Sequence, residues 1–245
     1  MFKRKLPNPE HGFTMLEVLV AIVVAVIFVS VAIQMMVLAT VFKVRAQEYT
    51  EATNWIQEDL ENIKYQAASY QYTSLVDEAT GDNTHESTDT VLYLASVDDF
   101  QAGDTVIVGT DSTNNKIAVG GVNAGAATIT LDASLDTSWL TDTAVVGTTR
   151  CNPADRYSGF ADGLRDKVAG SDNDASTSVE ETLYSKLFTS KAYIRQRTLT
   201  IVDAAPYRVL KVEYKISPGT TFDASKVIAS FDTEVIPNAA LQCPN

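Results

Sequence analysis

A single carboxylate stands at the start of a long apolar segment near the beginning of this 245-residue chain, and that segment limits what the chain can fold into. From Val18 to Phe42 the only polar side chains are Ser30, Gln34 and Thr40. A helix of this length spans about 37 Å, more than the roughly 30 Å hydrocarbon core of a bilayer. The sequence therefore predicts a membrane-spanning helix, with Glu17 as the charged residue at its start.

A secretory signal peptide is the alternative explanation for this segment, but its pattern differs. A signal peptide has an apolar core of 7 to 15 residues that ends in a cleavage site, whereas here the apolar run is longer and the candidate cleavage position, Gly12, precedes it. A plain anchor with an accidental Glu17 is also less favoured, because a carboxylate costs about 2.5–3.5 kcal/mol at the centre of a membrane helix and such residues are functional by default. We expect the span to remain in the mature chain.

Residues 12–17 read Gly-Phe-Thr-Met-Leu-Glu and follow a basic leader. This pattern resembles the processing and assembly motif of type IV prepilins and pseudopilins, which a membrane aspartyl peptidase cuts after the glycine and methylates on the new N-terminus. The resemblance covers residues 1–60 well and the remainder loosely. It implies cleavage between Gly12 and Phe13, an assembly role for Phe13 and Glu17, and three kinds of partner: a prepilin peptidase, other pilins or pseudopilins that pack through their helices, and an inner-membrane assembly platform.

Glu17 has a physical reason to act in assembly. After cleavage, Phe13 carries a free amine that is largely protonated near neutral pH, and Glu17 lies four residues further on, about 6 Å along the helix axis. When helices pack together both groups lose water, and an unpaired buried charge is far more costly than a paired one. A bond between Glu17 of one subunit and Phe13 of its neighbour satisfies both charges and sets the axial stagger.

The basic residues Lys3, Arg4 and Lys5 predict that the N-terminus is cytoplasmic. Lys43 and Arg45 follow the span, so the charge bias is slight and the motif decides the orientation. We expect a single-pass inner-membrane protein whose body is periplasmic or extracellular and which enters a filament after assembly.

The formal net charge is −12, and removal of residues 1–12 takes away three basic residues and one acidic residue, which leaves −14. An acidic surface of this kind repels phosphate, so we expect no nucleic-acid binding by the bulk surface. The one basic cluster of note is predicted to be a solvated strand face; it comprises Lys186, Lys191, Arg195 and Arg197.

Cys151 and Cys243 are the two cysteines of the chain. Outside the cytoplasm a disulfide between them is the simplest expectation, and its loop length corresponds to about 4–5 kcal/mol in the chain-entropy model. Many pilins close a C-terminal loop in this way, although this loop would be unusually long. Two unpaired thiols remain the alternative.

The predicted fold class is α+β: a long N-terminal helix, with a membrane half and an amphipathic half, packed on an antiparallel sheet, with a small all-β module inserted. The helix should run from about Phe13 to Tyr70, because apolar residues recur at spacings of three and four after Lys43. The expected parts are a leader (1–12), a membrane or filament-core helix (13–42), an amphipathic half (43–75), the β module (90–149), and a linker with the pilin-like sheet (150–245).

The module should have five short strands, arranged as a small antiparallel sheet or partly closed barrel, with glycines 120, 121 and 125 in hairpin turns. The expected strands are 91–97, 105–108, 116–119, 127–131 and 144–146, and 77–89 should be a loop. Residues 152–181 should be mostly irregular. After them, residues 193–202, 207–216 and 227–235 should form a meander that covers the helix stripe at Trp55, Ile56 and Ile63.

Metal binding is not favoured at either of two candidate positions. His85 with Glu86 is a lone histidine in an acidic loop, where a solvated side chain is the ordinary outcome. A calcium loop in the 152–181 segment would lack the glycine and the twelfth-position acid of an EF-hand; its candidate ligands are Asp172, Asp174, and Glu180 or Glu181. We predict no metal and no cofactor, and no residue constellation suggests an enzyme.

Three functions remain open. Gln34 occupies the mature position where major pilins often have a proline, which favours a minor pilin or pseudopilin over a major subunit. A minor type IV pilin would prime or decorate a pilus, and a pseudopilin would act in a type II secretion or DNA-uptake machine. The third hypothesis is an adhesin that uses the pilin helix as its anchor.

Overall fold

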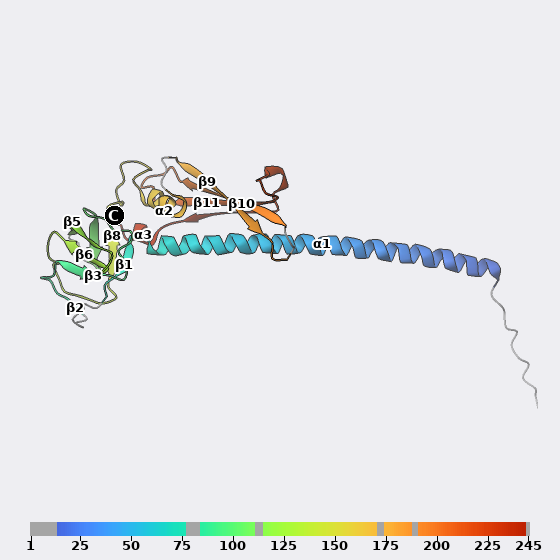
Figure 1. Ribbon diagram of the computed structural model, residues 1–245, viewed down its shortest axis with the longest axis horizontal. Coiled ribbons are helices and arrows are strands. Elements are labelled where there is room, and N and C mark those ends of the chain that lie inside the picture. The colour runs from blue at the N-terminus through green and yellow to red at the C-terminus, as the bar shows by residue number, and fades with distance from the viewer. Residues whose placement is uncertain (1–13, 77–83, 111–114, 171–173, 188–190, 244–245) are drawn as a thin grey trace, which may run out of the picture. The chain divides into compact units, whose positions relative to one another are not determined.

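The structure is a computed structural model that describes residues 14–76, 84–110, 115–170, 174–187 and 191–243. The chain divides into two compact units, residues 1–50 and residues 51–245. In the described part of the first unit the chain is helical, while the second unit contains the rest of that helix, all of the described strands and two shorter helices (Figure 1).

Helix α1 runs from Met15 to Ser69, close to the predicted bounds. Thr14 caps its start, because the N–H of Glu17 donates to the Thr14 carbonyl oxygen at 3.0 Å and to Thr14 Oγ1 at 3.3 Å. Two hydroxyls within the apolar half bond back to the helix itself: Ser30 to the Val26 carbonyl at 2.8 Å and Thr40 to the Met36 carbonyl at 2.9 Å. These bonds satisfy polar groups that would otherwise be costly in lipid.

The amphipathic half of α1 packs on a four-stranded antiparallel sheet with the order β12-β11-β10-β9 (Figure 1). Its strands are β9 (Ser176–Tyr184), β10 (Ala192–Ile201), β11 (Leu210–Pro218) and β12 (Ala229–Val235). The predicted meander and the contact with the Ile56 and Ile63 stripe are confirmed, and Trp55 packs at its side half-buried. The fold class is α+β, as predicted. The core buries Ala52, Ile56, Leu60, Ile63 and Ala67 of α1 against Tyr193, Leu199, Ile201, Leu210, Val212, Tyr214 and Ile216 of the sheet.

The prediction of a mostly irregular segment at 152–181 is wrong. Helix α2 (Phe160–Ala169) lies there. Its Ala161 and Leu164 enter the core between α1, which we call the spine, and the four-stranded sheet; we call this core the spine–sheet core. The segment also starts β9, an additional strand at the sheet edge. Both elements are rich in polar residues, so the apolar pattern of the sequence did not predict them. In α2, for example, Arg165 is fully buried and pairs with Asp162 at 2.8 Å.

The inserted module is a sheet of six strands in the order β1-β8-β4-β5-β6-β3. An antiparallel bridge between Leu75 and Leu94 joins the two edges, with the Val76 N–H donating to the Tyr93 carbonyl at 2.9 Å, so the sheet closes into a small barrel. The strands are β1 (Tyr72–Ser74), β3 (Val91–Tyr93), β4 (Thr105–Val108), β5 (Asn115–Asn123), β6 (Thr128–Leu131) and β8 (Ala144–Gly147).

The module differs from its predicted bounds in two places. It begins earlier, because α1 ends at Ser69 and β1 already belongs to the barrel sheet rather than to the helix. In the predicted 77–89 loop, a short strand β2 (Thr84–His85) pairs with β7 (Trp139–Leu140), while residues 77–83 lie outside the described residues. The barrel has its own apolar core; it includes Leu75, Leu92, Leu94, Val106, Val108, Ile117, Ile129 and Val145.

Gly120 and Gly121 lie inside β5, so the prediction that they form a hairpin turn is wrong. The pairing of β5 with β6 shifts register between Ile117 and Val122, which is the position of a bulge. Gly120 has a φ of +71°, and a Cβ on Gly121 would lie 2.6 Å from the Thr130 carbonyl oxygen. Glycine is therefore needed where β5 bends around the barrel.

A third, smaller core joins the barrel to the rest of the second unit. Tyr70 at the end of α1 and Val146 of β8 pack there with Phe160 of α2 and with α3 (Asn238–Leu241). The predicted disulfide is present in this core: Cys151 and Cys243 are bonded, with their Cα atoms 5.5 Å apart.

We expect Gly163→Ala to destabilise the second unit. A Cβ at Gly163 in α2 would lie 1.8 Å from Tyr70 Oη and 3.0 Å from Arg150 Cζ. Overpacking of this kind costs about 1–3 kcal/mol, which outweighs the gain of up to about 1 kcal/mol from removing a helix glycine. Urea unfolding followed by tryptophan fluorescence measures the change, since Trp55 and Trp139 lie at the two larger cores. Gly125→Ala is the control, because its nearest contact is an ordinary 3.5 Å; equal midpoints for the two variants would contradict the steric argument.

Candidate assembly site

Glu17 lies at the third helical position of α1 and is exposed on the helix surface. It is the only charged side chain from Met15 to Phe42. Its carboxylate in the first turn is favourable with respect to the helix dipole, but that interaction does not neutralise it in an apolar environment. Gly12 and Phe13, the predicted cleavage and pairing residues, lie outside the described residues.

Small residues follow Glu17 along one row of the helix. A shallow hollow on the helix surface is lined by Glu17, Val18, Ala21, Ile22 and Ala25. The spacing of Ala21 and Ala25 is the small-xxx-small pattern that lets two membrane helices approach closely. The carboxylate therefore borders a surface that suits a neighbouring helix.

A second carboxylate, Asp59, lies in the buried stripe of α1 and holds the sheet to the helix. It is 8% exposed, and it accepts bonds from Arg197 Nη1 at 2.8 and 3.0 Å and from Tyr214 Oη at 2.6 Å. Arg195 Nη2 lies 3.0 Å from the same carboxylate, and its Nη1 donates to the Trp55 carbonyl at 3.1 Å. Burial, and then the bond to Asp59, raise the pKa of Tyr214 above its usual range, so this hydroxyl stays a donor.

This arrangement corrects the prediction that Arg195 and Arg197 form a solvated strand face. Their side chains are each 12% exposed. On β10, Tyr193, Arg195, Arg197 and Leu199 occupy every second position, so all four side chains point to the same side of the sheet. The two-residue spacing of these four positions is present in the sequence, but the positive charges of Arg195 and Arg197 favoured the prediction of a solvated face.

Glu51 makes a second polar contact between α1 and the sheet. Its carboxylate accepts bonds from Ser185 Oγ at 2.6 Å and from the Lys186 N–H at 2.7 Å, just after β9. Although both residues are charged, Glu51 and Asp59 are buried. In each case the charge is met by a donor from the sheet.

The two candidate metal positions are used for other contacts. His85 is fully buried rather than solvated, and its Nε2 lies 3.0 Å from the Val76 carbonyl oxygen. Glu180 accepts a bond from Gln196 at 2.9 Å, and Glu181 pairs with Arg195. Asp172 lies outside the described residues, and the described residues contain no group of three potential ligands that could hold a metal ion.

We expect Asp59→Asn to destabilise the second unit by about 3–5 kcal/mol, because it leaves two buried guanidinium groups without their carboxylate. Urea unfolding monitored by tryptophan fluorescence gives the change, since Trp55 contacts this cluster. Asp232→Asn is the matched control, because Asp232 is exposed on β12. A loss below about 1 kcal/mol for Asp59→Asn, the range of an exposed ion pair, would show that the cluster contributes little net stability.

Comparison with known proteins gives a match for the N-terminal segment of the chain. A family model described as the prokaryotic N-terminal methylation motif matches residues 7–33. Neither a curated protein nor a solved structure gives a significant match to the chain. The matched region contains Gly12, Phe13 and Glu17, and α1 is long and apolar enough to cross a membrane, which fits a single-pass inner-membrane anchor. The motif implies processing by a prepilin peptidase and pilin-type assembly, so the N-terminal segment is similar to that of type IV pilin-like and pseudopilin-like subunits.

Proposed function

We propose that this chain is a minor structural subunit of a type IV pilus or of the complex that primes one, cleaved after Gly12 and assembled through its N-terminal helix. The observation that carries the proposal is the position of Glu17, the one charge in the span, in the first turn of α1. That carboxylate requires a cation once the helix is packed among apolar neighbours. The amine of Phe13 from a neighbouring subunit is the cation that cleavage would create.

A minor role is favoured by two features. Gln34 stands in the apolar half where a proline would interrupt the helix, and α1 is helical throughout Met15–Ser69. The barrel then adds a second body next to the four-stranded sheet, with its own core. A subunit that recurs along an entire fibre has less room for such an addition than one placed at few positions.

A pseudopilin of a secretion or DNA-uptake machine is the second candidate, and the methylation motif alone favours it equally. An adhesin that uses the pilin anchor is the third, with the barrel as its carrier. We propose a structural subunit and not an enzyme for all three, because the buried charged residues described above are held by ion pairs or hydrogen bonds within the second unit: Arg165 with Asp162, Arg197 with Asp59, and Glu51 with Ser185.

The mature N-terminus tests processing directly. Mass spectrometry of the protein purified from its own membrane should find a chain that starts at methylated Phe13. Gly12→Asp, which replaces the residue without a side chain at the cleavage site, should retain the leader. A wild-type chain that keeps residues 1–12 while present in filaments would refute the proposal.

We expect Glu17→Gln to be cleaved normally and to be lost from filaments by about tenfold or more, the factor expected for a lost interaction of at least about 1.4 kcal/mol. Immunoblots of sheared filaments and of the remaining membranes measure both steps. Glu61→Gln is the control, because Glu61 is exposed in the other half of α1. Normal incorporation of Glu17→Gln would contradict the assembly role, and a wild-type chain found only in membranes would favour the pseudopilin.

A further inference from the structure

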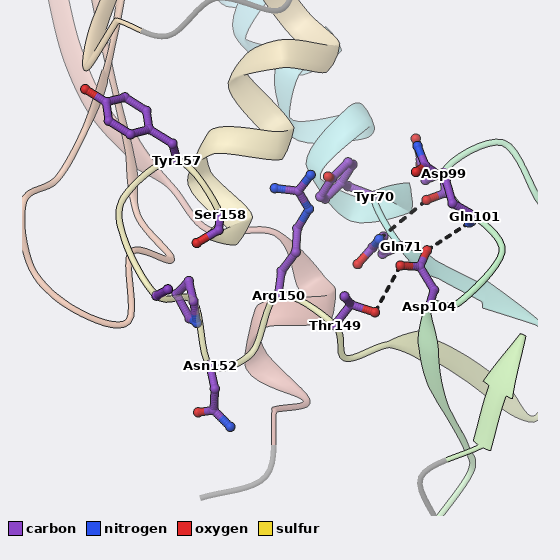
Figure 2. Close-up of a pocket in the computed structure, with 12 residues that line it drawn as sticks. Tyr70, Gln71, Asp99, Gln101, Asp104, Thr149, Arg150, Asn152, Tyr157 and Ser158 are labelled. Carbon is purple, nitrogen blue, oxygen red and sulfur yellow. Dashed lines mark hydrogen bonds between the residues drawn. The ribbon is translucent and has the colours of Figure 1, made fainter.

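A cavity of about 460 Å³ opens beside the end of α1, in the second unit (Figure 2). Three segments line it: the two residues that follow α1, the β3–β4 loop, and the chain between β8 and α2. Its size is within the range of small-molecule sites. The lining residues that matter below are Tyr70, Gln71, Asp104, Arg150, Asn152 and Tyr157.

One wall of the cavity is held rigidly. Asp104 accepts bonds from the Gln101 N–H at 2.8 Å and from Thr149 Oγ1 at 3.0 Å. Gln71 Nε2 lies 3.5 Å from the Asp99 carbonyl oxygen, while Gln71 Oε1 is buried and has no partner among the described residues. A buried acceptor without a partner costs about 1–3 kcal/mol, so a hydroxyl that reached this wall would offset a cost already present.

Arg150 stands between this wall and the 152–158 segment (Figure 2). Its Nη1 donates to the Gly159 carbonyl at 3.0 Å and lies 3.8 Å from Asp162. Its Nη2 and Nε have no partner among the described residues, and the side chain is 29% exposed. The guanidinium is thus fixed at one nitrogen and offers its other N–H groups to the cavity.

The charge around the cavity disfavours an anion. Asp99 and Asp104 line it together with Arg150, and Lys167, 2.6 Å from Asp99, is already paired. Burial raises the pKa of Tyr70 to about 12, so its hydroxyl stays protonated at neutral pH. The site therefore combines acceptors and donors without an excess of positive charge, which suits a neutral ligand whose groups both donate and accept.

We propose that this cavity binds a neutral mono- or disaccharide. Adjacent sugar hydroxyls each donate and accept, which matches Asp104 and Gln71 on one wall and Arg150 on the other. Asn152 and Tyr157 are exposed in the segment that forms the open side, and Figure 2 shows both side chains directed away from Arg150. A rotation about the Cα–Cβ bond therefore brings the amide to a further hydroxyl and the aromatic ring over an apolar sugar face. This site is independent of filament assembly, because none of its residues belongs to the N-terminal segment.

The test uses the full-length mature protein in lauryldimethylamine oxide micelles, since this detergent has no sugar headgroup. Saturation-transfer NMR is run with seven neutral sugars, glucose, galactose, mannose, N-acetylglucosamine, N-acetylgalactosamine, lactose and maltose, and with the anionic sugar N-acetylneuraminate. We expect at least one neutral sugar to bind with a Kd of about 10 mM or tighter. Arg150→Gln and Tyr157→Ala should each weaken it by about tenfold, the loss expected for one hydrogen-bonding or stacking partner.

Tyr184→Ala is the matched control, because Tyr184 is an exposed tyrosine at the end of β9, away from the lining residues. Arg150→Gln also removes a bond to Gly159, so its urea midpoint is measured, and Tyr157→Ala keeps the test decisive if that variant is unstable. The proposal is overturned if no neutral sugar of the panel binds, if both pocket variants bind as the wild type does, or if only the anionic N-acetylneuraminate binds.

Discussion

The contact between Asp59 and the two arginines of β10 is the constraint on which the arrangement of helix and sheet depends. The apolar residues around it supply most of the favourable free energy, because burial of apolar area is the main driving force of folding. Apolar contacts are not directional, however, and a helix can slide by a turn of about 5.4 Å and bury a similar area. The bonds from Arg197, Arg195 and Tyr214 to one carboxylate exist in a single register, so they select one alignment of α1 on the sheet.

Two carboxylates of this chain lie among apolar residues, where a carboxylate without water requires a positively charged partner. The partner comes from a different source in each case. Asp59 lies in an apolar stripe and takes its positive partners from β10 of the same unit. Glu17 lies in an apolar helix whose span contains no basic residue. The first carboxylate can therefore define an alignment within the subunit, whereas the second needs a charge from elsewhere once water is removed. With the assembly role proposed for Glu17, one half of this helix would direct folding and the other half assembly.

The sequence predicted the elements whose period is undisturbed. The spine, the β10–β11–β12 meander and the barrel strands all follow a spacing of about 3.6 or 2 residues. It failed where charged residues occupy core positions. Asp59 follows Ile56 by three residues and precedes Ile63 by four, so its spacing is that of the apolar stripe of α1. Arg197 lies two residues before Leu199 on β10, so its position is that of the buried face of the strand. A prediction based on the position of these residues in the periodic pattern, and not on their charge, would have placed Asp59 and Arg197 in the core. No comparable local signal marks β9, because this edge strand contains mainly serine, threonine and glutamate and has only Val179, Leu183 and Tyr184 as apolar or aromatic residues.

The way in which the barrel is inserted explains how the chain can carry an additional body without altering the spine–sheet core. Its first and last strands, β1 and β8, pair directly, with Tyr72 opposite Val146. The chain therefore enters and leaves the barrel at neighbouring positions, separated by the roughly 4.7–4.9 Å spacing of paired strands. The disulfide from Cys151 and the small core around Tyr70 and Phe160 then hold the exit point against α2 and α3. Because the entry and exit are adjacent and fixed, the barrel loops can vary with little effect on the register that Asp59 sets.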